Sequence, residues 1–193
     1  MRCRKLGPAD YKVMPWKNGA GSTTELLIEP AGATLEAFEW RLSMAAVAAS
    51  GPFSCFPGID RTLLLLEGDG LELDYGAHGR ALLPGPLVPA SFSGDWATHG
   101  RLLGGPCKDF NVMSDRARVK QTVTVLRPGT EPQGVAAQGT LLLYCAQGRV
   151  SLEGPGIRED LESGELLQCV GVALAAKGTL PESALIAVAL EPI

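Results

Sequence analysis

Hydrophobic and polar residues alternate along most of this chain with the period of a β-strand rather than that of a helix. In residues 62–75, a run of leucines precedes a Gly-Asp-Gly turn, after which leucine and tyrosine alternate with acidic residues. An apolar run followed by such alternation is typical of two strands, the second with one buried and one wet face. The pattern predicts a β-hairpin here. Residues 140–154 repeat it around a Gln-Gly turn and predict a second hairpin.

The parallel between the two regions continues beyond the hairpins. Residues 81–92 match 160–170, each as a strand entered through a glycine turn, and 101–113 correspond loosely to 180–190 as a closing strand. Two similar units of about 70 residues, with short turns and no long helix, predict a duplicated β-barrel or sandwich.

The repeat defines the expected domain organisation. We place the first barrel, with its N-terminal strands, at residues 1–117 and the second at 118–193, packed as one compact unit. Alternating threonine and valine predict a linking strand over 118–129. Residues 37–47 contain good helix formers, but their large apolar side chains recur at every second position, which favours a strand.

Composition supports a globular, β-rich protein. Hydrophobic residues make up 46% and charged residues 20% of the chain, and the 24 glycines and 14 prolines suit short strands joined by turns. With a net charge of −4 and no extended basic cluster, the chain offers no footprint for nucleic acid. No stretch reaches the roughly 20 apolar residues that cross a bilayer, so no membrane association is expected.

Cysteine and histidine usage bounds the chemistry. The five cysteines are scattered without a C-x-x-C pair, and the N-terminus lacks a signal-peptide core, so we expect reduced, mostly buried thiols in a cytoplasmic protein. The two histidines have no metal-ligand spacing, so neither a metal nor another cofactor is expected. No nucleophile elbow or Cys–His pair is present, and we assign no catalytic residue.

The segment MPWKNGAGSTTELLIEP, residues 14–30, is the first candidate for a binding site. It is either a plain hairpin loop, for which Asn-Gly is a strong signal, or a set of donors for a carboxylate with glycines that let the backbone approach. Its candidate ligand-binding residues are Trp16, Lys17, Asn18, Thr23 and Thr24.

The segment FSCFPGIDRT, residues 53–62, holds the strongest single candidate. Arg61 has the planar fork that matches two carboxylate oxygens, and Phe53 and Phe56 would form a pocket wall. Asp60 could hold Arg61 in place or contact a ligand amine. The alternative is an ordinary salt bridge at the rim, which contributes little.

Two further polar residues lie within predicted strands. Arg41 alternates with Trp40 and Leu42, so it points either into the barrel or into solvent, and the sequence leaves this choice open. Asn111, together with Lys108 and Asp109, interrupts an otherwise apolar strand.

Several of these blocks resemble the HutD/Ves family. PWKNG, FPGIDRTL and RLLGGPCKDFNVM carry the resemblance, which covers residues 10 to about 128 strongly and the remainder by layout. It implies an all-β bicupin fold, with two jelly-roll-like halves in one chain, and an association with bacterial histidine utilisation. A regulatory role has been proposed for the family, with N-formylglutamate or urocanate as suggested ligands, and no enzymatic activity is firmly attached to it.

Cupin enzymes generally hold a metal through histidines and a glutamate on the barrel strands. The corresponding strand here reads Gly-Ile-Asp-Arg, residues 58–61, a departure that suits an anionic ligand rather than a metal. We therefore expect a bicupin that binds a small carboxylate metabolite in a regulatory role.

Two other classes of function remain open. One is a metal-independent hydrolase or isomerase acting on a related acid, with Asp60 or Glu25 as general base and Lys17 or Arg61 as electrostatic stabiliser. The other is a structural partner whose exposed sheet edge pairs with another subunit, in which case a homodimer is possible.

Overall fold

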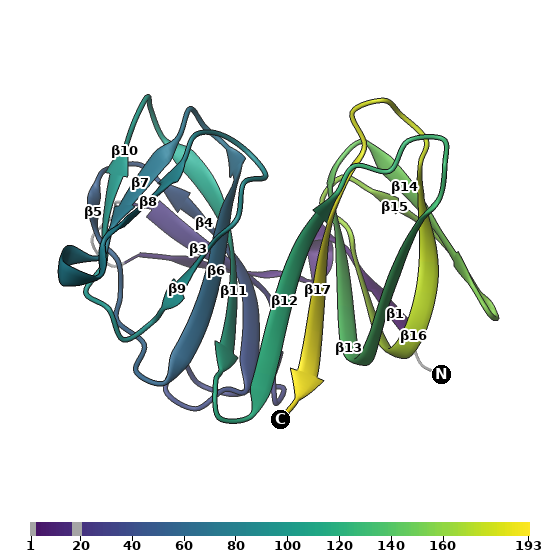
Figure 1. The fold of residues 1–193 in the computed structure, drawn as a ribbon, viewed down its shortest axis with the longest axis horizontal. Helices are drawn as coiled ribbons and strands as arrows, with labels where there is room; N and C mark the ends of the chain where they lie inside the picture. Colours follow the sequence, from purple (N-terminus) through teal and green to yellow (C-terminus); the bar gives the residue numbers. More distant parts are fainter. Residues whose placement is uncertain (1–2, 17–20) are drawn as a thin grey trace. The chain divides into compact units, whose positions relative to one another are not determined.

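The computed structural model describes residues 3–16 and 21–193, and its regular structure consists of β-strands in three sheets (Figure 1). Within those residues the helical segments are single 3-10 turns, η1 (Pro8–Asp10) and η2 (Gly76–His78), and neither has the length to cross a bilayer. The chain divides into two compact units. We call Tyr11–Val119 the first half, and Lys120–Ile193 with the described residues up to Asp10 the second half.

The first half contains two sheets that share one apolar core. Leu63 and Leu65 from one sheet pack with Leu71, Leu73 and Leu83 from the other, and all five are fully buried. In order, the six-stranded sheet comprises β2 (Lys12–Pro15), β3 (Gly21–Glu29), β4 (Trp40–Val47), β11 (Cys107–Asp115), β6 (Ile59–Glu67) and β9 (Ala90–Ser93). The four-stranded sheet comprises β5 (Gly51–Pro52), β10 (His99–Leu102), β7 (Leu71–Asp74) and β8 (Arg80–Leu83).

The second half is one seven-stranded sheet around its own core. Leu141, Leu143, Val150, Leu161 and Leu185 belong to this core, and all are fully buried. In order, its strands are β12 (Val119–Leu126), β17 (Ala184–Pro192), β13 (Gln133–Gln147), β16 (Leu166–Gly178), β14 (Arg149–Gly154) and β15 (Ile157–Glu162), with β1 (Cys3–Leu6) paired to β16.

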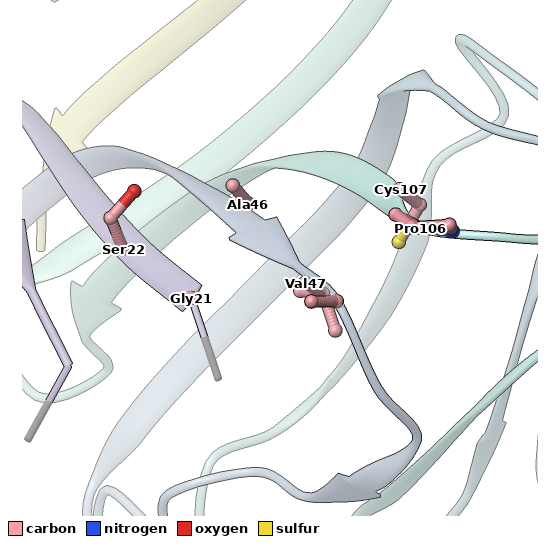
Figure 2. Close-up of a pocket in the computed structure, with 7 residues that line it drawn as sticks. Gly21, Ser22, Ala46, Val47, Pro106 and Cys107 are labelled. Carbon is pink, nitrogen blue, oxygen red and sulfur yellow. The ribbon is translucent and has the colours of Figure 1, made fainter. Parts of the chain in front are cut away.

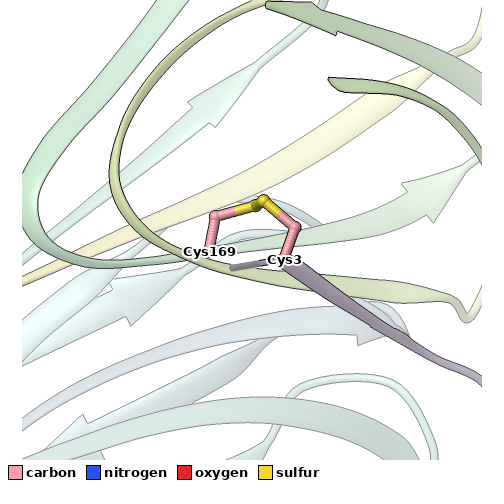
Figure 3. The surroundings of a disulfide bond; sticks show 2 residues. All are labelled: Cys3 and Cys169. Atoms are coloured by element: carbon pink, nitrogen blue, oxygen red, sulfur yellow. A yellow bond between two sulfur atoms is a disulfide. The ribbon is translucent and has the colours of Figure 1, made fainter. Parts of the chain in front are cut away.

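The N-terminal strand belongs to the second half rather than to the first. The division near residue 119 lies close to the expected boundary, but β1 pairs antiparallel with β16 and places Cys3 opposite Cys169. Figure 3 shows the disulfide that joins them. The prediction of five reduced thiols is therefore wrong for this pair, whereas Cys55, Cys107 and Cys145 are free. Because 166 residues separate the bonded cysteines, local sequence carries no sign of their contact.

Strand positions follow the sequence pattern closely, whereas two strand pairings do not. The strands predicted over 37–47 and 118–129 are present as β4 and β12. The predicted hairpins are wrong: β6 and β7 lie in different sheets, and β16 lies between β13 and β14. Hydrophobic alternation is a local property that identifies strands but does not choose their partners.

Glycines carry the chain from β6 to β7. Gly68 and Gly70 have φ values of 117° and 126°, a region that other residues rarely adopt. The resulting turn sends β7 to the facing sheet instead of back along β6. By contrast, β2 and β3 do pair as a hairpin, and the Trp16 N–H donates to the Gly21 carbonyl at 2.9 Å.

Candidate functional site

The first half contains a partly open cavity of about 670 Å³. Its floor is the inner face of β4, β11 and β6, where side chains two residues apart on a strand share one face. Met113 on β11 lies opposite Arg41 on β4 and Arg61 on β6. The next inward level along β11 is Asn111, followed by Asp109.

Two segments complete the cavity wall. Residues 49–56 cross one side, where the Phe53 N–H donates to the Thr98 carbonyl at 2.9 Å and the Phe56 N–H to the Gly94 carbonyl at 2.8 Å. These bonds hold the two phenylalanine rings against the cavity. On another side, the Trp16 indole Nε1 donates to Thr23 Oγ1 at 2.8 Å, which fixes the ring at the end of β2.

Arg61 is buried in an aromatic cage. Its residue is 4% exposed, and its guanidinium carbon lies 5.7, 5.5 and 5.0 Å from the ring centroids of Phe53, Phe56 and Phe92. Nη1 donates to the Ser54 carbonyl at 3.2 Å, and Nε has no hydrogen-bond partner. Burial lowers its pKa to about 10, so the group is still a cation at neutral pH.

The charge on Arg61 is not neutralised by an ion pair. Throughout the part of the chain that the structure describes, no carboxylate lies within ion-pairing distance of its guanidinium. Arg41 differs: its Nε contacts Glu25 Oε2 at 2.8 Å, and its Nη1 donates to Ser43 Oγ at 3.2 Å. Arg41 is also buried and faces the cavity, which decides between the two orientations that the sequence left open.

Asp109 is the acidic group of the cavity. The residue is 2% exposed, and its carboxylate accepts the Ala45 N–H at 3.2 Å. Burial raises the pKa of this carboxyl to about 7, although the positive charge of Arg61 opposes the shift. Nearby, Oδ1 of Asn111 is buried without a hydrogen-bond partner. Unpartnered buried polar atoms are costly, and they are common where a ligand or water completes the site.

The structure gathers most of the sequence-based candidates around this cavity. Those that line it are Trp16, Thr23, Arg41, Phe53, Phe56, Arg61 and Asn111. Thr24 lies outside the lining, since it alternates with Thr23 on β3. Lys17 and Asn18 lie outside the described residues.

Asp60 does not hold Arg61. Its carboxylate is half exposed and pairs with Arg116 at 2.9 Å, in a cluster with Asp95 and Ser93. Asp60 and Arg61 are adjacent on one strand, so their side chains leave it on opposite faces. With Glu25 paired to Arg41, both carboxylates considered as general bases are ion-paired.

Asp109 and Ser43 are cavity residues that the sequence analysis did not select as ligand contacts. Each lies two positions from a selected residue on the same strand, Asp109 from Asn111 and Ser43 from Arg41. Extending the selection by the strand period would have found both.

The cavity does not have the donor set of a metal centre. Its described lining includes one carboxylate, Asp109, and no imidazole, and two arginine side chains add positive charge. His78 and His99 are exposed, on η2 and β10. Across the described chain no group of three histidine, cysteine or acidic side chains is placed to share an ion. The residues that line the cavity therefore do not fit the metal that cupin enzymes use.

A second hollow in the first half offers little chemistry. Figure 2 shows this open site of about 350 Å³, which is lined by Gly21, Ser22, Ala46, Val47, Ala48, Pro106 and Cys107 and contains no charged side chain. Burial raises the pKa of the Cys107 thiol to about 11, so it stays protonated and a poor nucleophile.

Comparison with known proteins identifies the family to which this chain belongs. The HutD family model matches residues 8–185, so the chain belongs to the HutD family. An uncharacterised 21.2 kDa protein from the region 3′ of hutC in Pseudomonas putida is 37% identical over 152 residues, 78% of this chain and 77% of that protein. The resemblance seen in the sequence blocks is thereby confirmed, and it links the chain to histidine utilisation.

Solved structures agree on the fold. A conserved protein of unknown function from Pseudomonas aeruginosa PAO1 is 34% identical, with a TM-score of 0.90 over 99% of this chain and 100% of that one. HutD from Pseudomonas fluorescens SBW25, solved in a formate condition, is 32% identical, with a TM-score of 0.81 over 98% and 100%.

A more distant likeness bears on architecture alone. Oxalate decarboxylase from Lactobacillus farciminis is 8% identical, with a TM-score of 0.67 over 95% of this chain and 85% of that one. The predicted all-β bicupin fold is confirmed.

Proposed function

We propose that the first half binds a small carboxylate metabolite of histidine degradation and that the protein uses this binding in a regulatory role. The observation that carries the proposal is the guanidinium of Arg61, which is buried beside a cavity without an ion-pair partner. Removing a charge from water is expensive unless another charge or strong hydrogen bonds compensate for it. A bound carboxylate supplies both.

The aromatic cage prepares Arg61 for this role. Three phenylalanine rings around the guanidinium restrict its orientation, and cation–π attraction stabilises the charge without using its N–H donors. Nε is left free for an acceptor, and a guanidinium edge can bind two carboxylate oxygens side by side. Little side-chain freedom is then lost on binding, which favours affinity.

The comparisons support the ligand class. The Pseudomonas fluorescens HutD structure, with the same fold, was obtained in a formate condition, and formate is the smallest carboxylate. The Pseudomonas putida relative is encoded beside hutC. N-formylglutamate and urocanate are the candidate metabolites, and both carry a carboxylate.

A metal-independent enzyme is the second candidate, and Asp109 favours it. A carboxyl group whose pKa is about 7 is suited to accept a proton at neutral pH, and Arg61 could stabilise a developing negative charge in the same cavity. NMR of N-formylglutamate and urocanate incubated with the protein tests this candidate. Spectra unchanged over hours eliminate it.

Calorimetric titration of both metabolites tests the binding proposal. We expect Arg61→Met, which keeps an apolar side chain of similar length, to weaken binding by about 30-fold or more, the effect of removing one partner of a buried charge pair. Arg158→Met is the matched control, because Arg158 is 87% exposed and lies in the second half. No binding to the wild type at millimolar ligand, or equal binding to Arg61→Met, would overturn the proposal.

A further inference from the structure

We infer that the disulfide between Cys3 and Cys169 is a reversible redox switch of the second half. While the bond is formed, it holds β1 on one edge of β16. When an external dithiol reduces the bond, β1 leaves that edge and the rest of the sheet stays folded. The ligand cavity lies in the first half and takes no part in this switch.

The strand β1 covers part of one edge of β16. On that edge, residues 3–6 pair with residues 166–169, and β14 pairs further along with residues 175–178. The opposite edge of β16 is paired with β13. Without β1, the backbone N–H and C=O groups of 166–169 that face it would lose their partners. This stretch would then be an open sheet edge, which is available for pairing with another strand.

The non-covalent contacts of β1 are those of an element that opens locally. Among the described strands, β1 pairs with β16 alone, and of its four side chains only that of Leu6 is buried. Lys5 forms an ion pair with Glu165 at 2.7 Å and a hydrogen bond to the Asp160 carbonyl at 2.7 Å. Partly exposed ion pairs of this kind contribute little to stability. A short strand with one neighbour and one buried side chain opens at a lower free energy than the core of a sheet, so the disulfide is its main constraint.

An external dithiol can reach the bond from one side. Cys3 is partly exposed and lies beside the exposed cation Arg4, whereas Cys169 is fully buried in the core. A thiolate of the dithiol attacks the Cys3 sulfur, which forms a mixed disulfide and releases Cys169, and Cys169 takes up a proton. The second thiol of the reagent then attacks its own sulfur in the mixed disulfide, releases Cys3 as a thiol and closes the reagent's disulfide. Two electrons and two protons thus pass from the dithiol to the protein.

The second half contains one other cysteine, and it does not compete for the bond. Cys145 is fully buried on β13, and burial raises the pKa of its thiol to about 11, so the thiol is protonated at neutral pH. Only a thiolate attacks a disulfide. Cys169 lies opposite Leu141, four residues from Cys145 along β13, which is roughly 13 Å at about 3.3 Å per residue. The switch therefore has two states, the bonded pair and two free thiols.

Native-state hydrogen exchange with and without dithiothreitol tests the switch. In the oxidised protein, we expect the β1 amides that bond to β16 to be protected by at least about 100-fold, and reduction should bring them to within about 10-fold of an unstructured peptide. The amides that join β13 to β17 should stay protected by at least about 1,000-fold in both states, because they open only with global unfolding. Re-oxidation with oxidised glutathione should restore the protection of β1.

Two variants and a thiol count complete the experiment. Cys3→Ser breaks the bond without altering the buried Cys169, and it should exchange like the reduced wild type even without reductant. Cys55→Ser removes an exposed free thiol and should exchange like the oxidised wild type. Unchanged protection of β1 after alkylation has counted five thiols, or loss of protection throughout β13 and β17, would overturn the inference. Five thiols in the unreduced protein, or a bond that dithiothreitol reduces only in denaturant, would also overturn it.

Discussion

The strands β11 in the first half and β17 in the second half differ in the side chains that they direct inward. On β17, Leu185 and Ala187 turn into the core of the second half, where they pack among other apolar side chains. On β11, the corresponding inward positions include Asp109 and Asn111, and a cavity of about 670 Å³ lies above them. The second half uses its interior for stability, whereas the first half keeps part of its interior for polar contacts.

This contrast shows how the same kind of β-fold can serve two purposes within one chain. A core of leucine and valine excludes water and leaves nothing for a ligand to bind. Replacing two or three inward residues by charged and amide side chains opens space and leaves donors and acceptors unsatisfied. Such replacements lower the free energy of unfolding, and a ligand that binds the folded state raises it again.

The largest expected effect is on the apolar interior. Leu141→Ala removes a fully buried side chain from the second half and should lower the free energy of unfolding by about 2–5 kcal/mol. Leu82→Ala is the control, because Leu82 is 57% exposed and should change stability by less than about 0.5 kcal/mol. Urea unfolding measures both. Similar values for the two variants would contradict the packing described for the second half.

The next effect concerns the acidic interior of the first half. The pKa of Asp109 is raised from 3.8 to about 7 in the folded protein. Between about pH 4 and 7, the folded protein therefore holds a proton on this carboxyl that the unfolded chain releases. Stability is then lost as the pH rises through this interval, by up to about 4 kcal/mol for such a shift. In Asp109→Asn this decline should be absent. Unfolding curves of the two proteins from about pH 4 to 8 check it, and parallel pH dependences would count against the buried, raised-pKa carboxyl.

Removal of the disulfide in the second half should have the third-largest effect on stability. It closes a loop of more than 160 residues between Cys3 and Cys169, and its removal by Cys3→Ser with Cys169→Ser should lower stability by about 2–4 kcal/mol. Cys55→Ser, at an exposed free thiol, is the control. Thermal unfolding with and without reductant is the measurement. A wild type indifferent to reductant would show that the bond is not formed.

The smallest effect is expected at Arg61. Replacing a buried, unpaired guanidinium by an apolar side chain is often neutral or stabilising, so Arg61→Met should change stability by less than about 1 kcal/mol. The same variant should weaken ligand binding by about 30-fold or more. Urea unfolding of the ligand-free protein tests this separation of stability from function. A loss of several kcal/mol would mean that the cage and the Ser54 contact are mainly structural.

The contrast between the halves was only partly predictable from sequence. Period-two alternation identified β4 and β12, because the pattern is set by each strand's own two faces. The pairings of β6 with β7 and of β13 with β14 were wrong, since each glycine turn permits the chain to leave its neighbour.

For the site, Arg61, Phe53 and Phe56 could be selected because they flank one turn. In the sequence, Asp109 stands out only as a break in an apolar strand. Its burial depends on the pairing of β11 with β4 and β6, which are distant in sequence. The Cys3–Cys169 contact depends on the pairing of β1 with β16, for which the chain carries no local signal.

NMR of the arginine side chains tests the central claim most directly. The Arg61 Nε–H has no hydrogen-bond partner, and its resonance can be assigned from its loss in Arg61→Met. On titration with urocanate, we predict that this resonance moves downfield and saturates with the ligand, while the resonance of Arg116, already bound to Asp60, stays in place. Saturable binding that leaves the Arg61 resonance unmoved would contradict the account.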